Sequence, residues 1–136
     1  MKIESSKAPP PVGPYPHARR VGPFIFISGM GPRKPGTTKI PGTMTDAEGK
    51  VVAHDIEEQT RSTIENIKVV LEEAGSSLEN VVDVTCFLTN MADDFKKFNK
   101  VYGEYFEKVG ATRTTVEVLS LPTPICVELK VIAYHP

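Results

Sequence analysis

Hydrophobic residues recur at helical spacing along residues 54–77, which predicts an amphipathic helix. Asp55 and Glu58 form a capping pair at its start, and Gly75 follows its last turn. The apolar stripe consists of Ile56, Thr60, Ile64, Ile67, Val70, Leu71 and Ala74. Because a helix with one apolar stripe needs an apolar surface beside it, we expect this helix to lie on a sheet.

A second amphipathic pattern covers residues 93–110. Asp93 or Asp94 would cap its first turn, and Gly110 would end it. Its stripe contains more aromatic residues and consists of Phe95, Phe98, Val101, Tyr102, Tyr105, Phe106 and Val109. The two patterns together predict a pair of helices on one sheet.

Short β-branched runs predict strands at 24–28, 51–52, 80–90, 113–121 and 125–134. Alternation places Val82, Val84, Cys86 and Leu88 on one face of the third of these runs. In the last two runs, the positions expected to meet the helices are Val116, Val118, Ile125, Val127, Leu129 and Val131. The opposite face carries Arg113, Thr115, Glu117, Cys126, Glu128, Lys130 and Ile132. This mixed face is too apolar for solvent and too polar for a closed core, so we expect another subunit to cover it.

Two segments follow neither period. Residues 1–11 are polar and rich in proline, which predicts an extended arm ahead of a body that begins near Val12. Residues 29–42 predict a loop that lacks a phosphate-binding glycine motif, and its prolines remove amide donors. This loop is either a plain connection or a wall that brings Arg33 and Lys34 to an anionic ligand.

The composition excludes several classes of protein. A length of 136 residues fits one domain, 1–136, and 16 basic against 17 acidic residues give no basic field for nucleic acid or a membrane surface. Cys86 and Cys126 lie in apolar runs without metal-ligand spacing, so we expect free thiols in a reducing compartment. The sequence shows neither an apolar signal at its start nor a stretch that could span a membrane. These features predict a cytoplasmic protein.

Five residues are weighed as candidates for chemistry. Arg113 is either a surface arginine or a bidentate clamp for a carboxylate. Glu128 lies in the most apolar strand, so it is either part of an interface ion pair or a general base that positions water. Tyr15 would pack at the exit of the arm or offer its phenol to a ligand. His17 and His54 stand alone in the sequence, and we assign them no catalytic role.

Several stretches resemble the reactive-intermediate deaminase (Rid, YjgF-like) family. They are "APPPVGPYPHA", "IFISGMG", "NIKVVLEEAGSSLENVVDVTCFLTNMADDF", "YFEKVGATRTTVEVLSLP" and "VELKVIA". These stretches keep the family's order from Ala8 to the end of the chain. The resemblance implies an α+β fold of the chorismate-mutase type, with a mixed sheet and two helices on one face. It also implies a homotrimer with clefts between subunits, hydrolysis of imines or enamines, and no metal or cofactor.

The resemblance also implies roles for particular residues. Arg113 in "ATRTTVEV" matches the family's arginine, which holds the substrate carboxylate. Glu128 in "CVELKVIA" matches the family's glutamate, which helps to place the attacking water. Tyr15, Ser28 and Gly29 match positions that line the cleft.

Three departures from the usual family pattern concern the substrate. Thr115 stands where many members have cysteine, "LPTP" replaces "LPKG", and "GMGPRKPGTTKIPGT" is longer and more basic than the general segment. Together with "YPHARR", this long loop is similar to that of 2-aminomuconate deaminase, a family relative in bacterial degradation of aromatic compounds. The likeness implies hydrolysis of the dicarboxylate 2-aminomuconate to 4-oxalocrotonate (2-oxohex-3-enedioate) and ammonia.

The second carboxylate of such a substrate would need a second cation. Arg33 is the first candidate, Lys34 or Arg20 the next, and Lys39 the last. At the reacting carbon, backbone groups near Thr115 would assist Arg113 and Glu128 and line the substrate site. The alternatives are a broad-specificity 2-imino acid deaminase, a non-catalytic carboxylate-binding module, or an RNA-binding relative. The balanced charge and the lack of a basic strip with stacking aromatic residues oppose the last of these.

Overall fold

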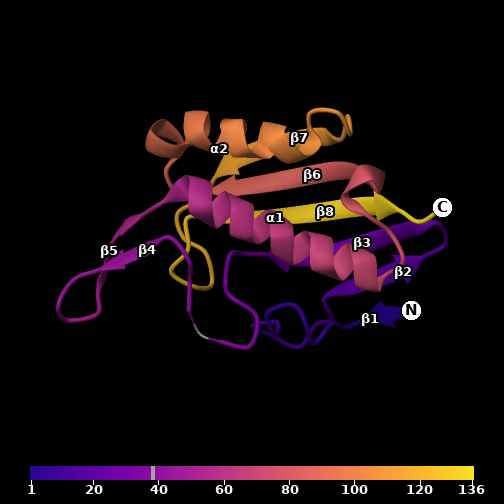
Figure 1. Cartoon of the computed structure of the whole chain (residues 1–136), viewed down its shortest axis with the longest axis horizontal. Coiled ribbons are helices and arrows are strands. Elements are labelled where there is room, and N and C mark those ends of the chain that lie inside the picture. Colours follow the sequence, from indigo (N-terminus) through magenta and orange to yellow (C-terminus); the bar gives the residue numbers. More distant parts are fainter. Residues whose placement is uncertain (38) are drawn as a thin grey trace.

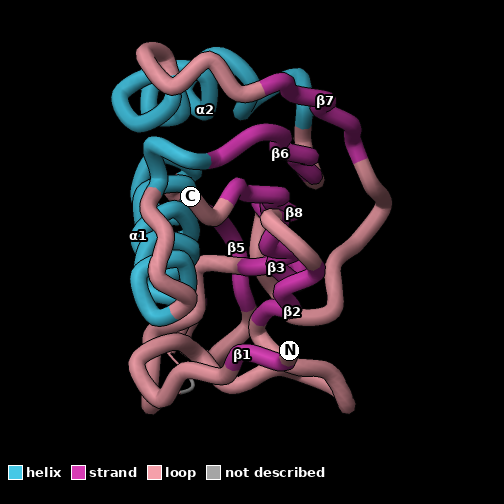
Figure 2. The backbone as a smooth tube through the Cα atoms, turned by 90° about the vertical axis from the view of Figure 1, so that its right-hand side faces the viewer, coloured by secondary structure: helices cyan, strands magenta, loops and turns pink. Residues whose placement is uncertain are grey.

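Among the described residues, 1–37 and 39–136, two helices lie side by side on one face of a six-stranded sheet and none covers the other face (Figure 1 and Figure 2). The elements of this computed structural model are β1 (Lys2–Ile3), β2 (Ala18–Val21), β3 (Phe24–Met30), β4 (Thr43–Thr45), β5 (Val51–His54), α1 (Ile56–Glu73), the short 3₁₀ helix η1 (Leu78–Asn80), β6 (Val81–Leu88), α2 (Met91–Phe106), β7 (Thr112–Glu117) and β8 (Val127–Tyr134). The predicted α+β fold, with two helices on one face of a mixed sheet, is confirmed.

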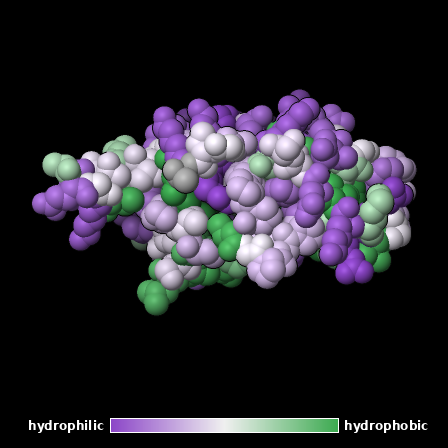
Figure 3. All heavy atoms as spheres, turned by 90° about the horizontal axis from the view of Figure 1, so that it is seen from below, coloured by the Kyte–Doolittle hydropathy of each residue, from purple (hydrophilic) through white to green (hydrophobic). Residues whose placement is uncertain are grey.

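The last strand of the chain lies in the middle of the sheet. The order is β1-β2-β3-β8-β6-β7, and all neighbouring pairs are antiparallel except β6 and β7. Parallel neighbours need a crossover connection, which α2 supplies. Strands β4 and β5 form a separate hairpin that projects from the body, and its end carries mostly hydrophilic side chains (Figure 1 and Figure 3).

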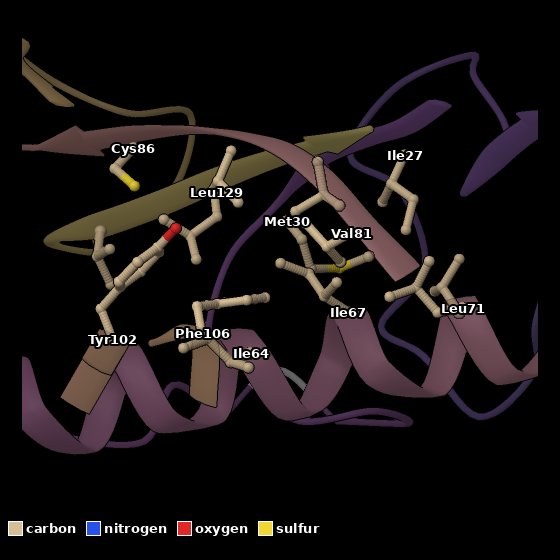
Figure 4. Packing of buried hydrophobic residues seen from close by; sticks show 14 of the residues in the cluster. Ile27, Met30, Ile64, Ile67, Leu71, Val81, Cys86, Tyr102, Phe106 and Leu129 are labelled. Atoms are coloured by element: carbon tan, nitrogen blue, oxygen red, sulfur yellow. The ribbon is translucent and has the colours of Figure 1, made fainter. Parts of the chain in front are cut away.

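The hydrophobic core fills the space between the sheet and the helices (Figure 4). Ile27 and Leu129 of the sheet pack with Ile64 and Ile67 of α1 and Phe106 of α2, and none of these is more than 2% exposed. Burial of these two apolar layers against each other is the main favourable contribution to folding. None of the described helices is long and apolar enough to cross a membrane.

Both predicted ends of α1 are confirmed. The amide of Glu58 donates to the Asp55 carboxylate at 3.1 Å, which satisfies one free N–H of the first turn. Just beyond the last turn, Gly75 has a φ of 80°, a conformation that glycine adopts without steric cost.

The predicted start of α2 is wrong by a few residues. The helix begins at Met91, before the expected caps Asp93 and Asp94. Asn90 is the N-cap, and its side chain accepts from the amide of Asp93 at 3.1 Å. The carboxylate of Glu117, from β7, accepts from the amide of Met91 at 2.8 Å. A residue distant in the sequence therefore helps to set the start of this helix.

One position in β6 faces away from the core, contrary to the alternation. Val81 pairs with Ala133 and Asp83 pairs with Ile132, so Val82 is an extra residue in the ladder. The resulting bulge leaves Val82 43% exposed and buries Val81 in its place.

The prediction of which β7 residues face the helices is also wrong. In the parallel ladder Arg113 pairs with Val84 and Thr115 pairs with Cys86, so both share the buried face of β6. Val116, expected on that face, is 39% exposed on the open face. Alternation along β7 identified two sets of residues, and the pairing with β6 assigned them to opposite faces from those expected.

Two further expectations need correction. Cys126 lies just ahead of β8 and faces α1, so it does not share the open face with Glu128. It is buried, and its amide donates to the side chain of Gln59 at 2.9 Å. The folded body also begins at Lys2, ahead of Val12, because β1 pairs with β2 along one edge of the sheet.

Candidate functional site

A β-bulge in β3 positions the glutamate that the sequence singled out. Ile27 pairs with Val131 and Met30 with Leu129, so Ser28 and Gly29 lie opposite one residue of β8. Glu128, on the open face of β8, extends over Gly29. A Cβ atom on Gly29 would lie 2.6 Å from Glu128 Oε2, too close for any side chain. The absence of a side chain at Gly29 thus creates the space that the carboxyl group occupies.

A cavity of about 50 Å³ surrounds this carboxyl group. The proline arm forms one wall through Pro9, Pro10 and Pro11. The bulge of β3, the loop that follows β3 and the segment ahead of β8 form the others. The volume is enough for a few water molecules or part of a small ligand.

Burial alters the acid–base properties of Glu128. The side chain is half-buried, and its desolvation raises the pKa of Glu128 above its ordinary value. Within residues 1–37 and 39–136 no cation forms an ion pair with it. A carboxyl group with a raised pKa in a cavity suits proton transfer better than a fully solvated one.

Tyr15, Ser28 and Gly29, which the resemblance placed in the cleft, all line this cavity. Tyr15 is 40% exposed, so its ring is not enclosed by the core. The Ser28 hydroxyl donates to the carbonyl of Pro16 at 2.8 Å, and the Ser28 amide donates to the carbonyl of His17 at 3.0 Å. Both bonds of Ser28 hold the exit of the arm beside the bulge.

His17, which the sequence left without a role, fastens the arm. It is buried and lines the cavity. Its Nδ1 accepts from the amide of Ser5 at 3.1 Å, and its Nε2 lies 2.7 Å from the carbonyl of Pro9. An imidazole makes both bonds when its proton is on Nε2. Nothing in the local sequence signals this role, because the partners lie eight and twelve residues away.

The first two loop cations named by the sequence, Arg33 and Lys34, lie in different surroundings. Arg33 lines the cavity, and its guanidinium donates to the carbonyl of Pro10 in the arm. Lys34 is exposed and lies outside the cavity, and its amide donates to the carbonyl of Lys39. Of the two, only Arg33 contributes to the cavity wall.

Arg113 lies on the other side of the molecule, packed against α2. Its guanidinium carbon is 4.7 Å from the ring centre of Tyr102, 5.6 Å from that of Phe98 and 5.8 Å from that of Phe95. Such stacking holds the guanidinium plane while leaving its N–H donors at the ring edges. No carboxylate forms an ion pair with Arg113 in the described part of the chain.

Two ionisable side chains near Arg113, those of Cys86 and Tyr102, are buried and resist ionisation. Burial raises the pKa of the Cys86 thiol and of the Tyr102 phenol to about 12 each. Thr115, expected in the substrate site, has a buried hydroxyl for which the described residues offer no hydrogen-bond partner. Because Thr115 pairs with the buried Cys86, it lies on the helix side of the sheet, and it does not line the cavity.

One chain does not bring Arg113 and Glu128 together. The two residues are on strands separated by β6, and they point to opposite faces of the sheet. The cavity of a single chain supplies a carboxyl group, a phenol and the Arg33 guanidinium. In the described part of the chain, no group of three or more His, Cys, Asp or Glu residues is placed to hold a metal ion.

Comparison with known proteins gives one consistent family. Residues 5–135 match the family described as endoribonuclease L-PSP. A RutC family protein of Pyrococcus abyssi is 46% identical over 132 residues, which cover 97% of this chain and 94% of that protein. Escherichia coli TdcF, described as a candidate reactive intermediate deaminase, is 33% identical and covers 96% of this chain and 94% of its own.

Solved structures agree with this result over almost the whole chain. A candidate endoribonuclease from Thermotoga maritima has a TM-score of 0.86 at 38% identity and covers 100% of this chain and 98% of its own. The structure of E. coli TdcF with bound serine has a TM-score of 0.84 at 32% identity, and the match covers 100% of this chain and 99% of the TdcF chain.

Proposed function

Because the chain belongs to the endoribonuclease L-PSP family, which includes the Rid and RutC proteins, we propose that it hydrolyses small carboxylated imines and enamines to a keto acid and ammonia. The observation that carries the proposal is the carboxyl group of Glu128, held over Gly29 in a cavity that raises its pKa. The E. coli relative described as a candidate reactive intermediate deaminase supports it.

Glu128 would act first as a base and then as an acid. The imine carbon of the substrate is already electrophilic, so water needs only a correctly placed proton acceptor to attack it. Glu128 takes a proton from water as the new C–O bond forms to the carbon of the protonated imine, and the C=N electrons become the lone pair of an amine. The carboxyl group then returns this proton to the amine. The C–N bond breaks and ammonia leaves, while the new hydroxyl group gives its proton to the Glu128 carboxylate and becomes the carbonyl of the keto acid. Proton transfer by a positioned group typically contributes ~10²–10⁴-fold to a rate.

Arg113 would hold the substrate carboxylate from a neighbouring copy of the chain. The residues separated by β6 can serve one reaction if β7 of one subunit lies beside the Glu128 cavity of the next. The open face of the sheet favours such an assembly, because it exposes Phe24, Phe26 and Val116. We propose a homotrimer, in which the three open faces pack together and three clefts form between subunits.

The dicarboxylate 2-aminomuconate is the substrate that the longer loop favours. Arg33 from this loop lines the same cavity as Glu128, and a guanidinium can bind a carboxylate through two parallel hydrogen bonds. One arginine would then hold the carboxylate beside the reacting carbon, and Arg33 would hold the distant one. The second candidate is a broad deaminase of 2-imino acids, which the serine bound to E. coli TdcF favours.

An ultraviolet assay of enzymatically generated 2-aminomuconate tests the proposal. We expect wild-type protein to convert it to 4-oxalocrotonate with release of ammonia, and Glu128→Gln to lose the activity. Activity only on imines generated from serine or threonine would establish the second candidate. A folded protein inactive on all these substrates would overturn the deaminase proposal, and binding of the same acids without turnover would indicate a carboxylate-binding module. Cleavage of RNA in a parallel assay would point to the activity named in the family's description.

A further inference from the structure

The backbone of Arg33 is held in place by the buried side-chain amide of Asn66, which lies on α1. Asn66 is 6% exposed, and it reaches the loop that follows β3. Its Nδ2 donates to the carbonyl of Gly31 at 3.0 Å and to the carbonyl of Arg33 at 2.9 Å. One side-chain amide thus uses both of its N–H groups on the same three-residue stretch. These bonds fix the backbone of Arg33 relative to the helix.

The same three residues, Gly31, Pro32 and Arg33, also line the cavity. The Arg33 guanidinium donates to the carbonyl of Pro10 in the arm. A guanidinium has five N–H groups, so a contact with one carbonyl leaves donors for a carboxylate. A carboxylate is also a stronger partner for a guanidinium than a neutral carbonyl is. Arg33 can therefore hold the arm and a ligand together, provided that its backbone stays where Asn66 places it.

We propose that Asn66 is a positioning residue that determines the preference of this cavity for dicarboxylates, by fixing the backbone from which Arg33 reaches the second carboxylate. The inference rests on the proposed function, because it concerns the same cavity. Asn66 itself touches no ligand. Its loss would leave two carbonyls without donors and let the loop move, so the guanidinium would no longer meet the distant carboxylate at a fixed separation.

A pair of matched ligands measures this preference without catalysis. Muconate and sorbate are six-carbon dienes that differ only in the second carboxylate, which sorbate replaces with a methyl group. We expect wild-type protein to bind muconate at least ~10-fold more tightly than sorbate by isothermal titration calorimetry, since one more charged contact is made. Asn66→Ala should reduce this preference about 10-fold and leave sorbate binding nearly unchanged.

A double-mutant cycle separates positioning from general stability. If Asn66 acts through Arg33, the double variant Arg33→Ala/Asn66→Ala should show the same preference as Arg33→Ala alone. Gln59→Ala is the matched control. Gln59 is another buried amide on α1, but its hydrogen bonds go to Thr43, His54 and Cys126 and none goes to Gly31 or Arg33, so this variant should keep the preference for muconate. Should Asn66→Ala not fold, Asn66→Ser, which can supply one donor in place of two, should show an intermediate preference.

The outcomes distinguish the two proposals. A folded Asn66 variant that keeps the wild-type preference would overturn the role of Asn66 and leave the dicarboxylate function intact. Equal losses for muconate and sorbate would also overturn it, because they would indicate a general structural role. Wild-type protein that binds both ligands equally would overturn the dicarboxylate function and this inference with it.

Discussion

The cavity around Glu128 and the edge strand around Arg113 hold their charged groups in opposite ways. Glu128 lies over a glycine in a cavity, and burial raises its pKa. The guanidinium carbon of Arg113 lies within 6 Å of the centres of three aromatic rings, whose faces attract a cation. Desolvation disfavours the charged form of the Glu128 carboxyl group and raises its pKa, whereas the aromatic rings attract the guanidinium cation.

This difference shows how the two halves of the proposed site would be prepared separately. A carboxyl group with a raised pKa is better suited to exchange protons, and a guanidinium beside aromatic rings keeps N–H donors for a carboxylate. Each half is complete in its own region of the chain. In a single chain Arg113 and Glu128 are not close to each other. Experiments that combine the two residues from different chains, or that disturb one region at a time, therefore test whether they act together.

The largest expected effect comes from mixing two inactive variants. Arg113→Ala and Glu128→Gln should each lose about 10²-fold or more in kcat/KM on 2-aminomuconate or another carboxylated imine. If the site forms between copies, unfolding and refolding the two together should restore about a quarter of wild-type activity, because each site draws one residue from each of two chains. A mixture as inactive as its components would show that the two residues do not share a site.

Gly29→Ala should disturb the Glu128 region alone. The new Cβ would lie 2.6 Å from Glu128 Oε2 and 3.0 Å from its Cδ, so the carboxyl group must move. Displacement of a catalytic group by about 1 Å can cost up to about 10²-fold in rate, which kcat measurements would detect. Gly103→Ala in α2 is the control, because a Cβ there meets no atom within 4 Å and should leave the rate unchanged. Equal rates for the two variants would contradict the placement of Glu128.

Glu128→Gln should also change the dependence of stability on pH. The pKa of Glu128 is raised from its ordinary value of 4.5, so the folded state binds this proton more tightly than the unfolded state does. Wild-type stability therefore falls as pH rises from 4.5 through the raised pKa. The variant should match the wild type near pH 4 and have a higher Tm at pH 7 to 8, measured by circular dichroism. Glu48→Gln, in the exposed hairpin, should leave the profile of the wild type unaltered; a Tm gain equal to that of Glu128→Gln would refute this explanation.

The smallest expected effect concerns the thiols of Cys86 and Cys126. Cys86 lies in the Arg113 region and Cys126 in the Glu128 region. Cys86 lies beside Thr115 under Arg113, and Cys126 lies just ahead of the strand that carries Glu128. Burial raises the pKa of each to about 12, so neither should react with a disulfide reagent in the native protein at pH 8. Both should react after unfolding. Rapid reaction of one thiol in the native state would show that its region opens.

Much of the fold could be predicted because it depends on neighbours in the sequence. The stripe and both ends of α1 follow from residues within a few positions of one another, and so does the alternation of Glu128 with the buried residues of β8. The start of α2 could not be predicted in the same way, since Glu117 contributes to it from another strand. The same limit applies to the site, where His17 and Asn66 bind carbonyl and amide groups that are distant in the sequence.

The sequence by itself determined the types of the main elements, the family to which the chain belongs, and the two residues most suited to the proposed chemistry. Only the tertiary structure decided that Arg113 and Glu128 lie on opposite faces and that Arg33, in preference to Lys34, lines the cavity. The reason is that periodicity records which residues of one strand share a face, whereas the pairing between strands determines which of its two faces is buried. That pairing joins residues from distant parts of the chain, as β6 and β7 do here.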